Sequence, residues 1–268
     1  MPPIRVLLTG ASGFLGRHVV ERAPRETVEL LVARRGHDGF DLADPPAAAG
    51  AVAAARPDLV LHLAAVSAMA ACERDPALAL QVNVHATAAI CEVAPRVVFA
   101  STDLVFGGDR APYAAADPPR PRSVYGRTKA RAEEVVLARP RGLVVRLPLL
   151  FGRSFDGRRG ATDMIRAAAA TGEELTLFVD EYRTPLHAGD AADVLWLLAL
   201  GDRGGVVHAA GRERVSRWEL GRRFVEVAEL ERVRLNAAPS TGGLRPKDVA
   251  LRSDVPAVRT LEAALADS

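Results

Sequence analysis

The sequence predicts an α/β protein with a Rossmann-type, doubly wound parallel sheet and a small C-terminal substrate-binding cap. Two observations support this fold class. Short apolar runs alternate with helical stretches over the first 150 residues, as in βαβ units, whose strands are parallel and covered on both faces. Beyond residue 150 this alternation weakens. We therefore expect one Rossmann domain over residues 1–150, and a smaller region over residues 151–268 packed on it, with strands that can return to the main sheet.

Each element follows from its hydrophobic period. Continuous apolar runs predict buried parallel strands at residues 4–9, 28–33, 59–63, 96–100, 143–147 and 206–208. Helical spacing predicts helices at residues 13–22, 77–93, 125–138, 162–171, 191–200 and 216–230, with a further helix beginning near Pro45. The Gly- and Arg-rich residues 152–160 should form a loop, and residues 244–254 an extended tail.

Composition excludes several classes of protein. The chain has 35 basic and 33 acidic residues, a balance that lacks the basic excess of a nucleic-acid binder. No apolar run reaches the roughly 18 residues of a membrane span, and the N-terminal segment does not resemble a signal peptide. Cys72 and Cys91 are too few for a disulfide framework, so we expect buried free thiols. These observations predict a cytoplasmic protein without a metal site; a homodimer is the default assembly.

A glycine-rich turn lies between the first predicted strand and helix. Gly10 permits a tight turn, Gly13 lets a pyrophosphate approach backbone N–H groups, and Gly16 lets the helix pack close to the sheet. In this strand–turn–helix context the spacing predicts a NAD(P)-binding domain over residues 1–150. The residues expected to hold the dinucleotide here are Gly10, Ser12, Gly13, Phe14 and Leu15.

The end of the second predicted strand favours NADP(H) over NAD(H). A NAD site usually has an acid there, whereas this chain has Arg34 and Arg35, which can pair with a 2′-phosphate. The alternative is that both arginines are ordinary surface residues of an Arg-rich chain. Asp41, followed by Leu42, can accept a hydrogen bond from the adenine amino group or cap the helix that begins near Pro45. Both interpretations remain open.

Tyr125 and Lys129 form the predicted chemical centre. They are one helical turn apart on the same face, and Lys129 is one of only two lysines in the chain. Reduction of a carbonyl needs a proton donor, which a tyrosine can supply when a nearby ammonium lowers its pKa. The same lysine can bond the nicotinamide ribose. A surface pair without function is the alternative.

The strand that ends near Ala100 places further polar groups at the same crevice. Residues just beyond the carboxyl end of a parallel strand face the ligand, so we expect Ala100 beside the cofactor and Thr102 and Asp103 beside the substrate. The Thr102 hydroxyl can polarise a substrate carbonyl. Asn83, on the long predicted helix, can support a proton-relay water or lie in solvent.

Taken together, these motifs resemble the extended short-chain dehydrogenase/reductase superfamily, and within it the dTDP-4-dehydrorhamnose reductases. The run from Ser101 to Gly107 is similar to the S-T-D-Y-V-F-D-G signature of that family. The other segments that carry the resemblance are Thr9 to Gly16, His62 to Ala65, Cys72-Glu73 with Pro76 and Asn83, Tyr125 to Lys129, and Arg146 with Phe151-Gly152.

The resemblance implies a function for particular positions. The catalytic centre would be Thr102, Tyr125 and Lys129. Beside the cofactor it places Leu63, Ala64, Ala65, Leu147 and Pro148. Segments around Arg183 and Arg245 resemble the family's substrate-side elements, and both arginines would bind a pyrophosphate group. The implied activity is NADPH-dependent reduction of a keto group on a nucleotide-activated deoxysugar.

The chain departs from the family at two segments that border the sugar. Residues 67–71 replace the polar residues of a V-D-x-x-E motif, and residues 146–152 lack the tryptophan of R-T-S-W-V-Y-G. The second segment also resembles the regulatory β subunit of methionine adenosyltransferase. A cofactor-binding regulatory subunit without turnover is therefore one alternative. A sugar-nucleotide epimerase or dehydratase is another, with Asp103 as the additional acid that a dehydratase needs.

Overall fold

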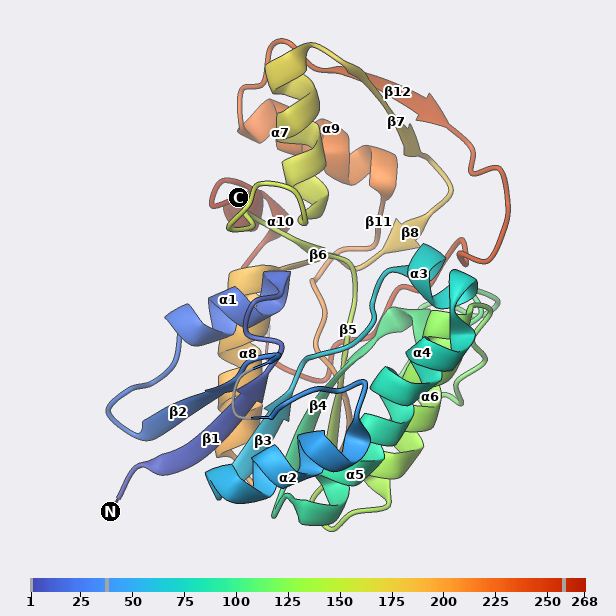
Figure 1. Cartoon of the computed structure of the whole chain (residues 1–268). Coiled ribbons are helices and arrows are strands. Elements are labelled where there is room, and N and C mark those ends of the chain that lie inside the picture. Colours follow the sequence, from blue (N-terminus) through green and yellow to red (C-terminus); the bar gives the residue numbers. More distant parts are fainter. Residues whose placement is uncertain (1, 37–38, 257–258) are drawn as a thin grey trace.

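A computed structural model describes residues 2–36, 39–256 and 259–268 of the chain. Its centre is a six-stranded parallel sheet with the strand order β10-β5-β4-β3-β1-β2 (Figure 1). The strands are β1 (Ile4–Thr9), β2 (Val28–Ala33), β3 (Leu59–His62), β4 (Val97–Thr102), β5 (Leu143–Leu147) and β10 (Gly205–His208). The predicted α/β class with a doubly wound sheet is confirmed.

Two helical layers cover the sheet because successive side chains of a strand point to opposite faces. On β1, Val6 and Leu8 enter one hydrophobic core, whereas Leu7 enters the other. The first core lies under α1 (Phe14–Glu21) and α8 (Ala188–Leu200), which contact each other. The helices on the opposite face are α2 (Pro45–Ala55), α5 (Ala86–Val93) and α6 (Val124–Leu137).

The strand order reverses direction at β1, which pairs with β2 on one side and with β3 on the other. The connections that leave these strands diverge to opposite faces, so a crevice opens at their carboxyl ends. The glycine-rich turn that joins β1 to α1 lies at this switch point, where a dinucleotide binds in folds of this kind.

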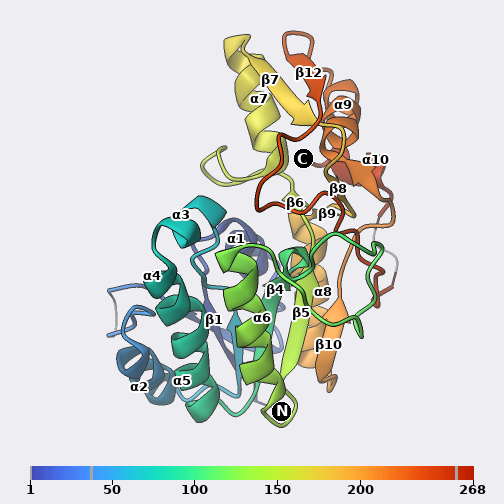
Figure 2. The same ribbon diagram turned by 90° about the vertical axis from the view of Figure 1, so that its right-hand side faces the viewer.

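The C-terminal region forms a cap beyond the carboxyl end of the sheet (Figures 1 and 2). It contains α7 (Ala161–Thr171), α9 (Arg217–Val227), α10 (Leu261–Leu265) and the parallel pair β7 (Glu174–Phe178) and β12 (Arg234–Ala238). These elements enclose their own core around Phe224 and Ile165. Residues 188–208 do not belong to the cap, because α8 and β10 lie in the main body.

Two short strand pairs link the cap to the body. The first joins β6 (Leu150–Phe151) with β9 (Leu186–His187). The second joins β8 (Tyr182–Arg183) with β11 (Val215–Ser216). The predicted extended tail runs past this region and forms isolated bridges from Leu251 to Tyr113 and from Asp248 to Tyr182.

The predicted single helix at residues 77–93 is wrong in detail. The structure has α3 (Met69–Arg74), α4 (Pro76–Leu80), a π-helical turn η1 (Gln81–His85) and α5. Asp75 begins α4 as its N-cap, with Pro76 at the first position. No helix within the described residues is long and apolar enough to cross a membrane.

Candidate active site

The glycine-rich turn is built by contacts that no larger residue would allow. Gly10 has a φ of +78°, and a Cβ there would lie 2.7 Å from the Ala64 nitrogen. A Cβ on Gly16 would lie 2.1 Å from the Gly10 carbonyl oxygen. The Gly13 N–H donates to the same carbonyl at 2.9 Å. This close packing of backbone leaves the start of α1 open toward the crevice, as an anion site requires.

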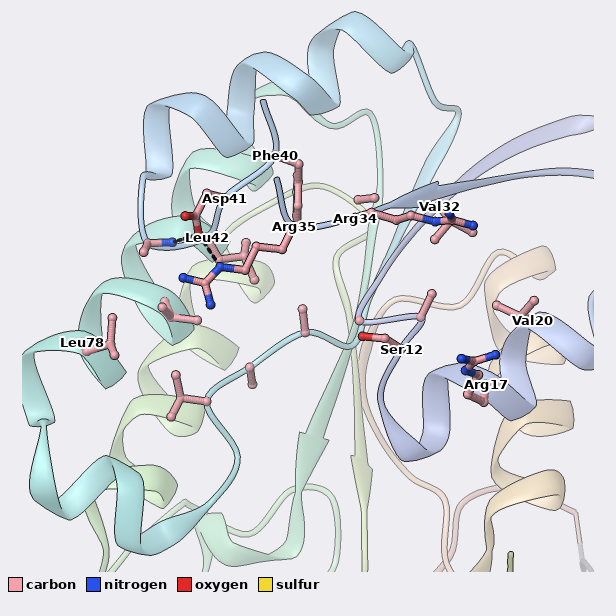
Figure 3. Close-up of a pocket in the computed structure, with 18 residues that line it drawn as sticks. Ser12, Arg17, Val20, Val32, Arg34, Arg35, Phe40, Asp41, Leu42 and Leu78 are labelled. Carbon is pink, nitrogen blue, oxygen red and sulfur yellow. Dashed lines mark hydrogen bonds and ion pairs between the residues drawn. The ribbon is translucent and has the colours of Figure 1, made fainter. Parts of the chain in front are cut away.

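A cavity of about 780 Å³ lies beside this turn (Figure 3). Ser12 and Arg17 border it from the side of α1, and Arg35 and Asp41 border it from the end of β2. The predicted dinucleotide residues that line the cavity are Gly10, Ser12, Arg34, Arg35, Asp41, Leu42, Ala64 and Ala65. Those that do not line it are Gly13, Phe14, Leu15, Leu63, Ala100, Tyr125, Lys129, Leu147 and Pro148.

The two arginines after β2 extend in opposite directions in Figure 3. Arg35 points toward Asp41, with 3.7 Å between Nε and Oδ1, and its side chain is 83% exposed. The proposed helix-capping role of Asp41 is wrong: Asp44 is the N-cap of α2, and its carboxylate accepts from the Ala47 N–H. Asp41 accepts from the Ala43 N–H at 2.9 Å within the preceding turn.

Lys129 is buried against the end of β4. Its ammonium donates to the Ala100 carbonyl at 2.6 Å and lies 3.7 Å from the centre of the Phe99 ring. Burial lowers the pKa of Lys129 to about 7, and the charge of Glu133 acts in the opposite direction. The structure therefore places a titratable ammonium directly beside the strand that carries Thr102.

Tyr125 lies one turn before Lys129 on α6, where it is half-buried and close to Thr102. The Thr102 hydroxyl donates to the Asp103 carboxylate at 3.2 Å and accepts from the Leu104 N–H. Burial raises the pKa of the Tyr125 phenol, and the negative charge of Asp103 raises it further. The expectation that Lys129 lowers this pKa does not hold for the chain alone, because Lys129 is directed at Ala100.

Asn83 does not lie in solvent, which was one of the two alternatives considered from the sequence. It is buried in the π-helical turn η1, whose wider winding turns its side chain inward. Its amide accepts from the Val66 N–H at 2.8 Å and donates to the Val66 carbonyl and to the Thr128 hydroxyl. Asn83 thus holds the loop after β3 against α6. Val66 lines the cavity and packs in the same apolar cluster as Tyr125, so it joins the two halves of the site.

A neutral network beneath the loop fixes its position. The Ala64 N–H donates to Thr9 Oγ1 at 3.2 Å, and this hydroxyl lies 2.7 Å from His62 Nδ1, the ring nitrogen that the contact at Nε2 leaves as the acceptor. The Thr87 hydroxyl donates to the Asn83 carbonyl, so it accepts from His62 Nε2 at 3.0 Å. Burial lowers the pKa of His62 to about 3, and the charge of Lys129 lowers it further. The imidazole is therefore neutral, with its proton on Nε2.

On the cap side, Arg183 does not have the free guanidinium expected of a pyrophosphate ligand. It is buried, it donates to the carbonyls of Tyr182, Pro246 and Lys247, and its Nε lies 3.4 Å from Asp103 Oδ2. These contacts join the cap to the end of β4. Burial raises the pKa of Asp103, although the charge of Arg183 opposes this.

Two other arginines face the same region. Arg245 is half-exposed, and its Nη1 lies 3.7 Å from Glu181 Oε2. Arg217, the first residue of α9, has no hydrogen bond or ion pair from its guanidinium among the described residues. Burial lowers the pKa of Arg217 to about 10, and the charge of Arg245 lowers it further. Arg217 was not predicted from the sequence because it is one of 33 arginines; its position directly after the helix cap Ser216 was the one available signal.

The predicted residues at the end of β5 lie in the body of the protein. Leu147 is buried in the core under α1 and α8, and Pro148, which follows it, is also buried. Leu147 pairs with Thr102 in the register of β4 and β5. Both residues therefore lie next to the strand end that carries the Thr102 hydroxyl.

The fold and this set of side chains define an oxidoreductase of the extended short-chain dehydrogenase/reductase class. Residues 4–257 match the family model described as RmlD substrate binding domain. The chain belongs to this family, and the predicted relationship to the dTDP-4-dehydrorhamnose reductases is confirmed.

Curated relatives cover most of the chain. It is 36% identical over 249 residues to a probable dTDP-4,6-dihydroxy-2-methyloxan-3-one 4-ketoreductase of Streptomyces antibioticus, covering 89% of this chain and 81% of that protein. A dTDP-4-dehydrorhamnose reductase of Mycobacterium tuberculosis is 33% identical over 273 residues, covering 98% and 87%. Methionine adenosyltransferase 2 subunit beta of Danio rerio is 30% identical over 233 residues, covering 82% and 72%.

Solved structures support the same fold. A dTDP-4-dehydrorhamnose reductase of Bacillus anthracis, in complex with NADP, superposes with a TM-score of 0.90 at 22% identity, covering 98% of this chain and 97% of that chain. A second dTDP-4-dehydrorhamnose reductase, from Clostridium acetobutylicum, gives a TM-score of 0.87 at 25% identity, with the same coverage.

The neutral His62 network predicts acid-sensitive stability. The unfolded chain binds a proton at His62 near pH 6.5, whereas the folded chain stays neutral down to about pH 3. This contribution to stability is complete above pH 6.5 and is lost progressively as the pH falls from 6.5 toward about 3. The free energy of unfolding, measured with urea, should drop between pH 7 and pH 5 by about 2 kcal/mol because of His62 alone.

In His62→Gln the drop in the free energy of unfolding between pH 7 and pH 5 should be smaller by about that amount, because the amide cannot titrate. His85→Gln, at an exposed position, is the matched control and leaves the network intact. An equal slope in the wild type and in His62→Gln would contradict the assignment.

Proposed function

We propose that the chain is an NADPH-dependent reductase of a keto group on a nucleotide-activated deoxysugar. The observation that carries this proposal is the convergence of Thr102, Tyr125 and Lys129 at the carboxyl end of β4, next to the glycine-turn cavity. The relatives named as ketoreductases and reductases of dTDP-linked sugars support the substrate class.

The residues present fit a dinucleotide. Gly10 and Gly16 form a backbone cradle that a Cβ would fill, and the cavity has the volume of a large ligand. Arg34 and Arg35 offer exposed guanidinium groups where the fold places the adenine ribose. Guanidinium groups match a 2′-phosphate, so we assign NADP(H) as the cofactor. When bound, it supplies the hydride.

The chain's own residues supply the proton and the polarisation. The raised pKa of Tyr125 keeps the phenol protonated near neutral pH, as a proton donor to a developing alkoxide requires. The Thr102 hydroxyl, which now donates to Asp103, can turn to the substrate oxygen. Lys129 holds its ammonium at the strand end, where it can bind ribose hydroxyls and favour negative charge on the phenol.

The anionic part of the substrate fits the cap-side arginines. Arg217 and Arg245 are cationic, lie between the cap and the body, and face the region of Asp103. We assign them to the diphosphate, whereas Arg183 positions Asp103. This arrangement puts the sugar between the diphosphate site and Thr102.

Two alternative functions use the same fold. The likeness to methionine adenosyltransferase subunit beta favours a regulatory subunit, but the complete set of Thr102, Tyr125 and Lys129 supports a reductase. A dehydratase needs Asp103 as a free acid. Its hydrogen bond from Thr102 and its ion pair with Arg183 argue against that role.

Replacing the proton donor should abolish turnover and preserve cofactor binding. For Tyr125→Phe we expect kcat to fall by about 10²- to 10⁴-fold, because the phenyl ring cannot donate a proton. NADPH oxidation is measured over a panel of nucleotide-linked 4-keto sugars, and cofactor affinity by fluorescence. Undiminished turnover in the variant would refute the role of Tyr125. Copurification with a partner, and NADPH binding without turnover on any panel member, would favour the regulatory subunit.

The cofactor preference should depend on the arginines after β2. The double variant Arg34→Ser and Arg35→Ser should raise the KM for NADPH by about 10- to 100-fold, because charge-assisted hydrogen bonds to a phosphate are lost. The KM for NADH should stay within about twofold, because NADH lacks that phosphate. Arg232→Ser, at an exposed position of the cap, is the control. Equal loss for both cofactors would argue against a 2′-phosphate site.

Substrate affinity should depend on Arg217. The substitution Arg217→Met keeps the apolar stem but removes the charge, and it should raise the KM for the nucleotide sugar by about 10-fold or more. The KM for NADPH should not change. Arg222→Met, on an exposed face of the same helix, controls for changes in α9. A lowered kcat with an unchanged KM for the sugar would show that Arg217 does not bind the diphosphate.

A further inference from the structure

We propose that Glu133 is a positioning residue for the reaction. Its buried carboxylate fixes the catalytic helix against two strands and supplies the counter-charge that keeps Lys129 in its ammonium form. This inference rests on the proposed function for its meaning, but not for its test. The carboxylate itself is placed away from the reacting atoms and acts through Lys129.

The spacing on α6 puts Glu133 on the catalytic face. Tyr125, Lys129 and Glu133 are each four residues apart, so they lie above one another along one side of the helix. The side chain of Glu133 is 3% exposed. An unpaired carboxylate at such a position would be strongly unfavourable, so its partners must explain its presence.

Those partners belong to the two strands beneath the helix. Arg146 on β5 donates to the carboxylate from Nε at 3.0 and 3.1 Å and from Nη2 at 2.7 Å. Ser101 on β4 donates its hydroxyl to Oε1. Ser101 is directly between Ala100, whose carbonyl holds the Lys129 ammonium, and Thr102. The carboxylate therefore sets the distance between the helix and the strand that together carry all three reacting groups.

The charges around Lys129 give Glu133 its second effect. From β4 the ammonium faces the Ala100 carbonyl and the Phe99 ring, and from β3 the neutral His62. Glu133 is the carboxylate that opposes the effect of burial on the pKa of Lys129. Arg146 pairs with that carboxylate and also contacts His208, whose pKa burial lowers to about 4, so that this imidazole is neutral as well.

The protonation state of Lys129 therefore depends on Glu133. With Glu133 present, the buried cations Lys129 and Arg146 share one carboxylate; without it, the two cations are buried together with no counter-charge from this position. Because burial brings the pKa of Lys129 to about 7, a further decrease would leave mostly neutral amine at neutral pH. A neutral amine carries no charge to strengthen its hydrogen bonds, so it binds ribose hydroxyls less strongly than an ammonium does.

The test is an NMR titration of Lys129 in the full-length chain. Protein labelled with ¹³C at lysine Cε gives only two lysine signals, from Lys129 and Lys247, which Lys247→Arg assigns. We expect a titration midpoint near pH 7 for Lys129 in the wild type, and a midpoint about one pH unit lower in Glu133→Gln. Glu134→Gln, at the neighbouring exposed position, should leave the midpoint unchanged.

A second variant covers the case in which Glu133→Gln does not fold. The double variant Glu133→Gln and Arg146→Gln leaves no buried guanidinium without a partner. Its midpoint should still be below that of the wild type, but by less than in the single variant, because the more distant cation is also lost.

A wild-type midpoint in either folded variant would overturn the proposal, since a purely structural Glu133 lowers thermal stability without moving the titration. A midpoint lower by about one pH unit should be accompanied by about tenfold lower kcat/KM for NADPH near pH 7.5, because the ammonium fraction falls by that factor. The titration does not depend on turnover. Full activity of Tyr125→Phe would therefore refute the proposed function and leave the Glu133 result standing.

Discussion

The buried ion pair between Glu133 and Arg146 is the constraint on which the catalytic side of the molecule depends. Separating two desolvated charges leaves each without a partner in the interior, so the pair admits one arrangement of α6, β4 and β5. Tyr125 and Lys129 lie on that helix, and Thr102 lies on that strand. The reacting groups are consequently fixed in place before any ligand arrives, and preorganised groups lose little freedom on binding.

The opposite side of α6 is held by neutral groups, and the reason is electrostatic. Asn83 joins Thr128 to the loop after β3, and His62 joins that loop to β1 and α5. Burial already lowers the pKa of Lys129, and a second cation here would lower it further by repulsion. Burial, and to a smaller extent the charge of Lys129, lowers the pKa of His62, so the imidazole serves as an uncharged link. The buried contacts between Asn83, Thr128 and Val66 therefore add no charge beside Lys129.

How much of this arrangement the sequence could predict depends on the range of the interactions. The glycine turn and the pair Tyr125 and Lys129 are local patterns, and the scarcity of lysine made the second one visible. Asn83 was predicted on a regular helix because nothing local reveals the π-helical turn that directs it inward. Arg183 was predicted as a ligand because the three carbonyls that surround it come partly from residues 246 and 247, far along the chain. Arg217 was missed because a common residue type carries no signal until its surroundings are known.

The arginines at the two ends of the site differ in their exposure to water. At the end of β2 the arginines are exposed, so water and salt screen their charges. At the cap, Arg217 is desolvated beside Arg245. Its charge therefore interacts more strongly with other charges than an exposed arginine would, but burying that charge costs more free energy. Asp103 joins this cationic cluster to Thr102, since it accepts from the hydroxyl and pairs with Arg183. If Thr102 turns its proton toward a substrate, Asp103 still keeps Arg183 as its partner, so the link between the cap and the body does not depend on the Thr102 proton.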